Sequence, residues 1–238
     1  VALVCSEKGI RKIIFTSTVA VYGFAKSVTD ENGKINPFND YGRSKFEAEK
    51  KLCEWQSKKE NSLIIVRPTV IFGEGNRGNV YNLVNQIASR RFLMIGSGAN
   101  KKSMAYVGNV VAFLDACISS NKKYEVFNYV DTPSMDMNTL VKHVKKSLLL
   151  NNKIAFRLPY WLGLSIGYFA DGVARLTGIS LPISSIRVRK FCAPTEFMSK
   201  KNSLEGFQAP FTLADGLNRT IESEFIKPDP DREIFFTE

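Results

Sequence analysis

The sequence predicts an α/β protein that is built on a parallel sheet. Two short apolar runs with β character, residues 12–16 and 62–66, lie on either side of a segment with helical spacing, residues 41–55. The second run is continuously apolar, which is typical of a parallel strand that helices cover on both faces. The first run passes into three hydroxyl residues, 16–18, at the carboxyl end of a strand, where open α/β sheets bind ligands.

The composition of the 238 residues is that of an ordinary globular protein, with 44% hydrophobic and 24% charged residues. A formal net charge of +10 suits an anionic partner, but the lysines and arginines occur as scattered pairs, so we expect no nucleic-acid partner. The four cysteines are far apart, which argues against a zinc site or a disulfide framework and favours the cytoplasm. No signal peptide and no cluster of metal ligands is visible in the sequence.

The segment that begins at Tyr41 is predicted to be a helix that carries chemistry. Asn39 or Asp40 can cap it, and Tyr41 and Lys45 share one of its faces because they are four residues apart. A nearby cation and the positive end of the helix dipole both favour phenolate over phenol. A tyrosine with an ordinary pKa of ~10 would thereby become a usable proton acceptor near neutral pH. On its own such a pair is more often a surface tyrosine beside a solvated lysine, so its surroundings decide the matter.

The remaining elements follow from apolar periodicity and turn residues. The strand at 62–66 is expected to end at Arg67-Pro68, because proline cannot continue a central ladder. The other expected elements are, in chain order, the end of a helix at 1–6 capped by Gly9, a helix at about 80–89, strands at 92–95 and 103–107, a helix at 110–119, a strand at 125–130 and helices at 137–148 and 213–225.

Residues 73–78 form the pattern G-x-G-x-x-G between an expected strand and an expected helix. The same pattern marks dinucleotide-binding loops, but no acidic residue follows near Ile95, where a ribose partner belongs. We therefore interpret the loop as unrelated to the cofactor phosphates. In the alternative interpretation, Lys101 and Lys102 would contact a 2′-phosphate.

The most apolar stretch is residues 158–176, which Asp171 and Arg175 interrupt. A membrane-spanning helix needs about 20 mostly apolar residues, so we expect no membrane span. We expect instead an amphipathic helix that packs a smaller lobe and ends at Gly178, with contact to a membrane surface or another subunit as the alternative.

Four motifs resemble the extended short-chain dehydrogenase/reductase family, especially its nucleotide-sugar epimerases and dehydratases. They are residues 17–23 (STVAVYG), 41–45 (YGRSK), 67–73 (RPTVIFG) and 102–107 (KSMAYV), and the resemblance extends weakly to about Phe225. Their order and spacing make the resemblance specific. It implies a Rossmann-like doubly wound parallel sheet and a smaller mixed α/β C-terminal substrate lobe.

In the resembled family the first strand, the glycine-rich phosphate loop and the acidic ribose ligand precede the position of residue 1. We therefore expect residues 1–150 to be the later part of an NAD-binding domain that lacks its first β-α units, with substrate-lobe segments interleaved around 73–105. Residues 151–225 are expected to form the smaller substrate lobe, and residues 226–238 a loose tail. The chain alone is expected to bind NAD weakly and to be inactive.

The resemblance also implies the catalytic roles. Tyr41 would take the proton from a substrate hydroxyl while the hydride of the same carbon passes to NAD. Lys45 would lower the pKa of Tyr41 and hydrogen-bond the nicotinamide ribose, and Thr18 would hold the reacting oxygen. The cofactor would lie along Thr16 and Ser17 and would meet the backbone groups of Pro68 and Thr69.

For the diphosphate of a nucleotide sugar, the resemblance implies Asn79, Lys102 and Arg189, with Arg189 preferred to Arg187. Asn109 stands where the family usually has aspartate. NAD is preferred to NADP by resemblance alone, because the discriminating residue belongs to the part of the family that precedes residue 1.

Sugar dehydratases of the family carry an Asp-Glu pair directly after the threonine, whereas this chain has Val19 and Ala20. Dehydration is therefore disfavoured, and we expect 4-epimerisation of a nucleoside-diphosphate sugar through a keto intermediate. The alternatives are a 4-keto reductase, a hydroxysteroid-type dehydrogenase, and a truncated subunit or interaction module without activity. Whether the protein forms a homodimer is left open.

Overall fold

The computed structural model describes residues 1–23, 28–58, 60–151, 156–179, 181, 183–199, 204 and 206–236. These form two compact units. The first comprises Val1–Glu74, Ser103–Ser134 and Glu196–Thr220, and the second comprises Gly75–Lys102, Met135–Thr195 and Ile221–Glu238. The units are more interleaved than the expected division, since residues 135–150 belong to the second unit and residues 196–220 return to the first.

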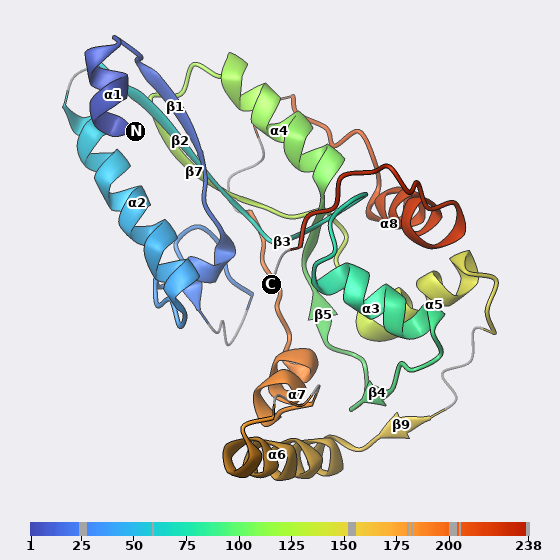
Figure 1. Cartoon of the computed structure of the whole chain (residues 1–238). Coiled ribbons are helices and arrows are strands. Elements are labelled where there is room, and N and C mark those ends of the chain that lie inside the picture. The colour runs from blue at the N-terminus through green and yellow to red at the C-terminus, as the bar shows by residue number, and fades with distance from the viewer. Residues whose placement is uncertain are drawn as a thin grey trace. The chain divides into compact units, whose positions relative to one another are not determined.

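The first unit contains a parallel sheet of three strands in the order β1-β2-β7 (Figure 1). These are β1 (Lys12–Thr16), β2 (Ser62–Pro68) and β7 (Tyr124–Tyr129). Proline ends β2 as expected: Pro68 pairs with β7 alone, whereas β1 pairs with β2 only as far as Val66. A second parallel pair joins β3 (Val70–Phe72) to β6 (Met104–Tyr106).

Helices cover both faces of this sheet, which confirms the expected parallel α/β architecture (Figure 1). Leu63 and Ile65 of β2 pack against Leu52 of α2 (Asp40–Ser57), on the side of α1 (Ala2–Glu7). The alternate residues of β2 pack on the other face against α4 (Val107–Ser119). Because successive side chains of a strand point to opposite faces, a strand buried on both has to be continuously apolar.

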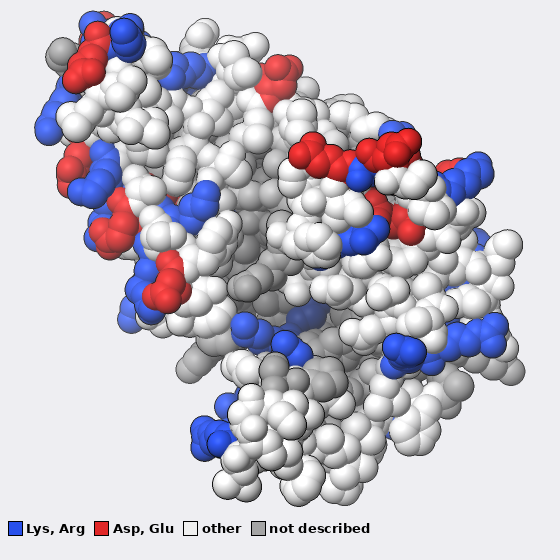
Figure 2. Space-filling model, in the orientation of Figure 1, with Lys and Arg blue, Asp and Glu red and all other residues white. Residues whose placement is uncertain are grey.

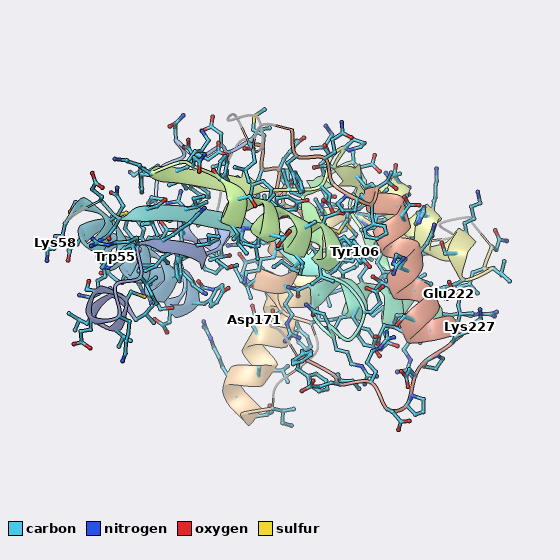
Figure 3. The ribbon with its side chains drawn as sticks, turned by 90° about the horizontal axis from the view of Figure 1, so that it is seen from above. Trp55, Lys58, Tyr106, Asp171, Glu222 and Lys227 are labelled. Carbon is cyan, nitrogen blue, oxygen red and sulfur yellow. The ribbon has the colours of Figure 1, made fainter. Side chains whose placement is uncertain are left out.

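Two local features fix the helices of this face. Gly9 has a φ of +69° and follows α1, where Gly9 N–H and Ile10 N–H bond the carbonyls of Ser6 and Cys5, so the expected glycine cap is confirmed. Trp55, labelled in Figure 3, donates its indole N–H to Ser6 Oγ at 3.0 Å and so fastens α2 to α1.

The first unit also contains a 3₁₀ helix, η1 (Val19–Tyr22), and α8 (Leu213–Ile221).

The second unit is mostly helical. Its helices are α3 (Asn79–Ala88), α5 (Met137–Ser147), α6 (Tyr160–Thr177), α7 (Ser185–Cys192) and a π-helix, η2 (Glu222–Ile226). Its strands form two short pairs, parallel β4 (Met94–Ile95) with β9 (Arg157–Leu158) and antiparallel β5 (Lys101–Lys102) with β8 (Met135–Asp136). No helix in the described part of the chain is long and apolar enough to cross a membrane.

The C-terminal segment is not the loose tail that the sequence suggested. Phe235 pairs with the glycine loop, since its N–H bonds Gly75 O at 2.8 Å and its carbonyl accepts from Arg77 N–H at 2.8 Å. Gly75 has a φ of +80°, and a Cβ there would lie 2.9 Å from Glu233 O, so the loop needs glycine to let the segment approach. Sequence periodicity misses this contact because the pairing is between backbone groups.

The helix expected near 158–176 is present as α6, and Gly178 ends it in the left-handed conformation with a φ of +70°. The helix packs within its unit mainly through small residues rather than through its largest side chains. Its buried residues are Gly163, Gly167 and Ala170, whereas Trp161 and Phe169 are exposed. Small residues face inward because α7 comes so close that a Cβ at Gly167 would lie 2.8 Å from Ser185 N.

Candidate active site

The site is built around the first turn of α2. Asn39 caps this helix, because its Oδ1 accepts the Gly42 N–H at 2.9 Å, and this confirms the cap that the sequence predicts. Tyr41 therefore stands at the start of α2, with about half of its surface exposed. Lys45 follows one turn later, and its ammonium lies 5.9 Å from the centre of the Tyr41 ring.

A close approach of two backbones brings this turn to Thr18. A Cβ at Gly42 would lie 2.7 Å from the carbonyl oxygen of Ala20, so only glycine lets α2 rest against η1. Thr18 precedes η1 and caps it, with Thr18 Oγ1 accepting the Ala20 N–H at 3.1 Å. Thr18 and Tyr41 are thus held on two segments that touch at the neighbouring residues Ala20 and Gly42.

Lys45 connects this helix to the end of the central sheet. Its Nζ donates to the carbonyl of Thr16, the last residue of β1, at 3.0 Å. The ammonium also lies 5.2 Å from the centre of the Phe15 ring. An ammonium carries three donors, and Thr16 takes one of them. Lys45 therefore places a positive charge between the phenol of Tyr41 and the carboxyl end of β1.

Two hydroxyls at the same edge of the sheet lack a partner. Ser17 and Thr69 follow β1 and β2, are 2% and 5% exposed, and have side-chain oxygens that are buried without a hydrogen bond. An unsatisfied buried polar group costs about 1–3 kcal/mol, so native structures rarely keep one without a reason. A polar ligand at the carboxyl ends of adjacent parallel strands supplies such a reason, and the nicotinamide end of NAD fits it.

The backbone of the second strand end is less available than the sequence suggested. Pro68 has no N–H, and the Thr69 N–H donates to Tyr129 O at 3.0 Å. What Thr69 offers a ligand is therefore its unpaired hydroxyl rather than its amide. The Ser17 N–H likewise donates to Val66 O at 2.7 Å, so only the Ser17 hydroxyl is available to a ligand.

A buried ion pair, which the sequence analysis did not find, holds these segments together. Arg67 binds Glu49 of α2 through two hydrogen bonds of 2.9 and 2.5 Å, and both side chains are nearly inaccessible. Arg67 also donates to the hydroxyl of Tyr22 at 2.7 Å, and Tyr22 donates to Asn128 Oδ1 at 2.9 Å. The network joins α2, η1, β2 and β7 directly beneath the site.

Burial opposes the charge of Arg67, but its hydrogen bond to Glu49 and the attraction of its neighbours outweigh burial and raise its pKa above the ordinary value. Burial raises the pKa of Tyr22. One signal for the pair was present in the sequence. Glu49 follows Lys45 by four residues and precedes Leu52 by three, so a carboxylate stands on the apolar face of α2.

The residues expected to bind the diphosphate belong to the second unit. Asn79 opens α3 and is exposed. Lys102 Nζ donates to the carbonyls of Lys190 and Ala193, at 2.9 and 2.6 Å, so its ammonium lies at the C-terminal end of α7. Burial lowers the pKa of Lys102 to about 8. Arg189 of α7 donates to the hydroxyl of Tyr168, and its guanidinium carbon lies 5.5 Å from the centre of that ring.

The side chain of Asn109 is fully engaged in hydrogen bonds within the protein. Its Nδ2 donates to Asp131 at 3.0 Å and to the Phe211 carbonyl at 2.9 Å, and its Oδ1 accepts the Phe211 N–H. Burial raises the pKa of Asp131. The side chain of Asn109 thus joins α4 to the segment before α8 by hydrogen bonds.

Two backbone amides of the glycine loop already donate hydrogen bonds within the protein. Gly75 N–H donates to Glu224 Oε1 at 2.7 Å, and Arg77 N–H donates to Phe235 O. A phosphate-binding loop directs its amides at the ligand, so this geometry agrees with our interpretation that residues 73–78 do not bind the cofactor phosphates. Within the described ranges, no three His, Cys, Asp or Glu residues gather as a metal site.

Comparison with known proteins agrees with the geometry. The sequence model of the family described as "NAD dependent epimerase/dehydratase family" matches residues 1–129. A curated relative from Escherichia coli O157:H7, named N-acetyl-alpha-D-glucosaminyl-diphospho-ditrans,octacis-undecaprenol 4-epimerase, is 51% identical over 236 residues, covering 98% of this chain and 71% of the relative. UDP-glucose 4-epimerase of Vibrio cholerae is 28% identical over 229 residues, covering 91% of this chain and 64% of that protein.

Among solved structures, UDP-glucuronic acid 4-epimerase from Bacillus cereus, in complex with UDP-glucuronic acid and NAD, matches with a TM-score of 0.65 at 16% identity. The match covers 93% of this chain and 63% of that one, and it shows a shared fold. The family match and the Rossmann-like fold together define an enzyme of the NAD-binding class.

The chain belongs to the NAD-dependent epimerase/dehydratase family. The expected fold class, family, enzyme class and NAD dependence are thereby confirmed. The chain spans 64% of the Vibrio cholerae relative, so the activity and substrate of the whole protein are the subject of a proposal.

Proposed function

We propose that this chain carries the catalytic residues of an NAD-dependent 4-epimerase whose sugar substrate is linked to a diphosphate. The observation that carries the proposal is the position of the Lys45 ammonium, which bonds the end of β1 and faces the ring of Tyr41. The 51% identity to a protein named as a 4-epimerase supports the same reaction. The first unit then serves the cofactor and the second unit serves the substrate.

In this mechanism Tyr41 accepts the proton of the sugar 4-hydroxyl and later returns it. Lys45 stabilises the phenolate by its charge and offers a remaining donor to the nicotinamide ribose. Thr18 Oγ1 already accepts a hydrogen bond from Ala20, so its own proton is directed to the reacting oxygen. NAD, when bound, would supply the acceptor for the C4 hydride and the donor for its return to C4.

The unpaired hydroxyls of Ser17 and Thr69 would hold the nicotinamide end of NAD. Val19 and Ala20, which follow Thr18, carry no acid or base, so the neighbouring hydroxyl of the sugar is not expelled and the keto sugar is reduced again.

The carrier of the sugar is proposed to be a polyprenyl diphosphate, because the 51% identical relative is named for an undecaprenyl-diphosphate-linked N-acetylglucosamine. The second candidate is a nucleoside diphosphate, which the name of the 28% identical relative favours. Asn79 and Arg189 stay candidate diphosphate ligands. Lys102 is the weaker candidate because its ammonium donates to the carbonyls of Lys190 and Ala193 at the C-terminal end of α7.

The test uses a chimaera in which this chain is joined, in the relative's own order, to the part of the Escherichia coli protein that the match leaves uncovered. The chimaera is incubated with NAD and either N-acetylglucosaminyl diphosphoundecaprenol or UDP-N-acetylglucosamine, and the released sugars are separated chromatographically. Appearance of the 4-epimer from the lipid-linked substrate alone supports both parts of the proposal. Appearance from the UDP-sugar alone overturns the carrier, and no 4-epimer from either overturns the reaction.

The chain by itself remains predicted to bind NAD weakly, and calorimetry that gives a micromolar dissociation constant would contradict this. A cytoplasmic location is also still a prediction. Whether the protein forms a homodimer stays open, and analytical ultracentrifugation tests it.

A further inference from the structure

Helix α6 buries small residues and exposes large apolar ones, whereas an ordinary amphipathic helix buries its large apolar residues. Its inward face consists of Gly163, Gly167 and Ala170, and a Cβ at Gly163 would lie 2.7 Å from Ile95 Cγ2. This face fits only small residues. Several large apolar residues of α6 are therefore left exposed.

The outward face of α6 carries an apolar stripe. It consists of Trp161, Tyr168, Phe169 and Leu176, which are 67%, 51%, 76% and 89% exposed. Their spacing of seven or eight residues places them on one side of the helix, and Ser165 and Gly172 lie between them on the same side. Single exposed apolar residues are common on protein surfaces, but a row of them that includes three aromatic side chains usually marks an interaction site.

Basic residues flank the stripe. Arg175 lies seven residues beyond Tyr168, on the same side of α6, and the guanidinium of Arg189 stacks on the Tyr168 ring. Within the sequence of residues 157–192, Asp171 is the only acidic residue. Its carboxylate, labelled on α6 in Figure 3, accepts the Ser185 N–H at 3.1 Å. Figure 2 shows the surface over α6, at its lower edge, as mostly uncharged with basic residues beside it.

We propose that α6 and α7 form a docking surface for a membrane that contains anionic phospholipid. In this arrangement α6 lies in the plane of the interface, the apolar stripe enters the headgroup region, and the flanking arginines meet lipid phosphates. Tryptophan and tyrosine prefer this depth because their rings are apolar and their N–H or O–H groups stay hydrated. A helix that lies on a membrane has a strongly apolar face and cations along its polar side, and α6 with α7 has both.

The membrane is preferred to a protein partner because the stripe is bordered by cations. The polyprenol in the name of the 51% identical relative is a lipid that resides in membranes, which agrees with this choice. The inference does not depend on the proposed reaction, and its test measures binding without turnover.

The first experiment measures sedimentation of the full chain with vesicles of phosphatidylcholine, with or without phosphatidylglycerol. We expect binding to the anionic vesicles that weakens as salt is raised. The double variant Phe169→Ser/Leu176→Ser should lower the partition coefficient by at least about ten-fold, because it removes the apolar stripe. The matched control is Phe236→Ser, since Phe236 is 79% exposed outside α6, and it should bind normally.

The charges are tested separately. Arg175→Gln/Arg189→Gln should weaken binding by roughly five-fold for each charge near the surface. The control Lys51→Gln/Lys58→Gln, near the C-terminal end of α2, removes the same net charge and should have little effect. Equal losses in the two double variants would mean that net charge, rather than this surface, drives binding, and would overturn the proposal.

The second experiment locates the contact. The chain has two tryptophans, of which Trp55 is 5% exposed and Trp161 is 67% exposed. Lipids brominated near the headgroup should quench the emission of Trp161, and the quenching should disappear in Trp161→Phe while sedimentation persists. No binding to anionic vesicles overturns the proposal. Binding without quenching, or a dimer that is lost in Phe169→Ser/Leu176→Ser, assigns the stripe to another partner and overturns it as well.

Discussion

Helices α2 and α6 have the same length, 18 residues, and each carries an apolar stripe, yet they use it in opposite ways. Helix α2 buries Leu52 and Trp55 against the sheet and α1, so its first two turns hold Tyr41 and Lys45 in one place. Helix α6 buries glycine and alanine and exposes its large side chains. Helical periodicity therefore finds a stripe, but the neighbouring element decides whether the stripe faces inward.

The largest expected effect is on turnover, and it concerns Tyr41 at the start of α2. In the chimaera, Tyr41→Phe should lower turnover by roughly a hundred-fold or more, because the proton acceptor is lost while the ring remains. Tyr160→Phe on α6 is the matched control, since Tyr160 is 43% exposed and Tyr41 is 54% exposed. Initial rates and thermal melting are measured for both variants. A Tyr41→Phe protein that turns over normally would contradict the mechanism.

The next effect is on the free energy of unfolding, and it compares a buried ion pair of α2 with an exposed one. Glu49→Gln leaves Arg67 without its charged partner in a buried position and should lower the free energy of unfolding by about 3–5 kcal/mol. Glu47→Gln on the same helix removes an exposed pair with Lys50, whose side chains are 61% and 50% accessible, and should cost less than about 1 kcal/mol. Urea denaturation measures both. Similar losses would mean that the buried pair does not anchor α2.

A smaller effect tests the inverted packing of α6. Gly167→Ala introduces a Cβ 2.8 Å from the Ser185 backbone and should destabilise the protein by about 1–3 kcal/mol. Gly172→Ala lies on the exposed side, with nothing within 4 Å of the new Cβ, and should stabilise the helix by up to about 1 kcal/mol. If thermal denaturation shifted in the same direction for both, the small-residue face would not be the packed one.

A further effect is a pH dependence at α7, the helix on which α6 packs. Burial lowers the pKa of Lys102 from 10.5 to about 8. Between these values the unfolded chain holds a proton that the folded chain has lost, so stability should rise as pH increases from about 8 towards 10.5. In Lys102→Met this rise should be absent. Urea midpoints measured across the range for both proteins check it, and parallel curves would contradict the lowered pKa.

Much of the fold could be predicted because its signals are local. The apolar run of β2, the Asn39 cap of α2 and the glycine after α1 each act within a few residues of sequence. The same holds for Tyr41 and Lys45, whose spacing alone places them on one helix face. The order of the motifs then indicated the family.

What the sequence could not show depends on contacts between distant segments. Arg67 meets Glu49 across the first unit, and nothing near either residue in the sequence names its partner. Lys102 was expected at the substrate, but its ammonium lies against the carbonyls of Lys190 and Ala193 at the end of α7. The pairing of Phe235 with the glycine loop uses backbone groups, which every residue carries.

The central claim, that a hydride leaves C4 of the sugar and returns to the same carbon while Tyr41 handles only the hydroxyl proton, can be tested with an isotope. The chimaera is given substrate with deuterium at C4 in ordinary water, and the 4-epimer is analysed by mass spectrometry. The account predicts that the product keeps its deuterium. Exchange of that deuterium for solvent hydrogen would mean that the carbon is epimerised by proton transfer, and would contradict the role of the cofactor and the site described above.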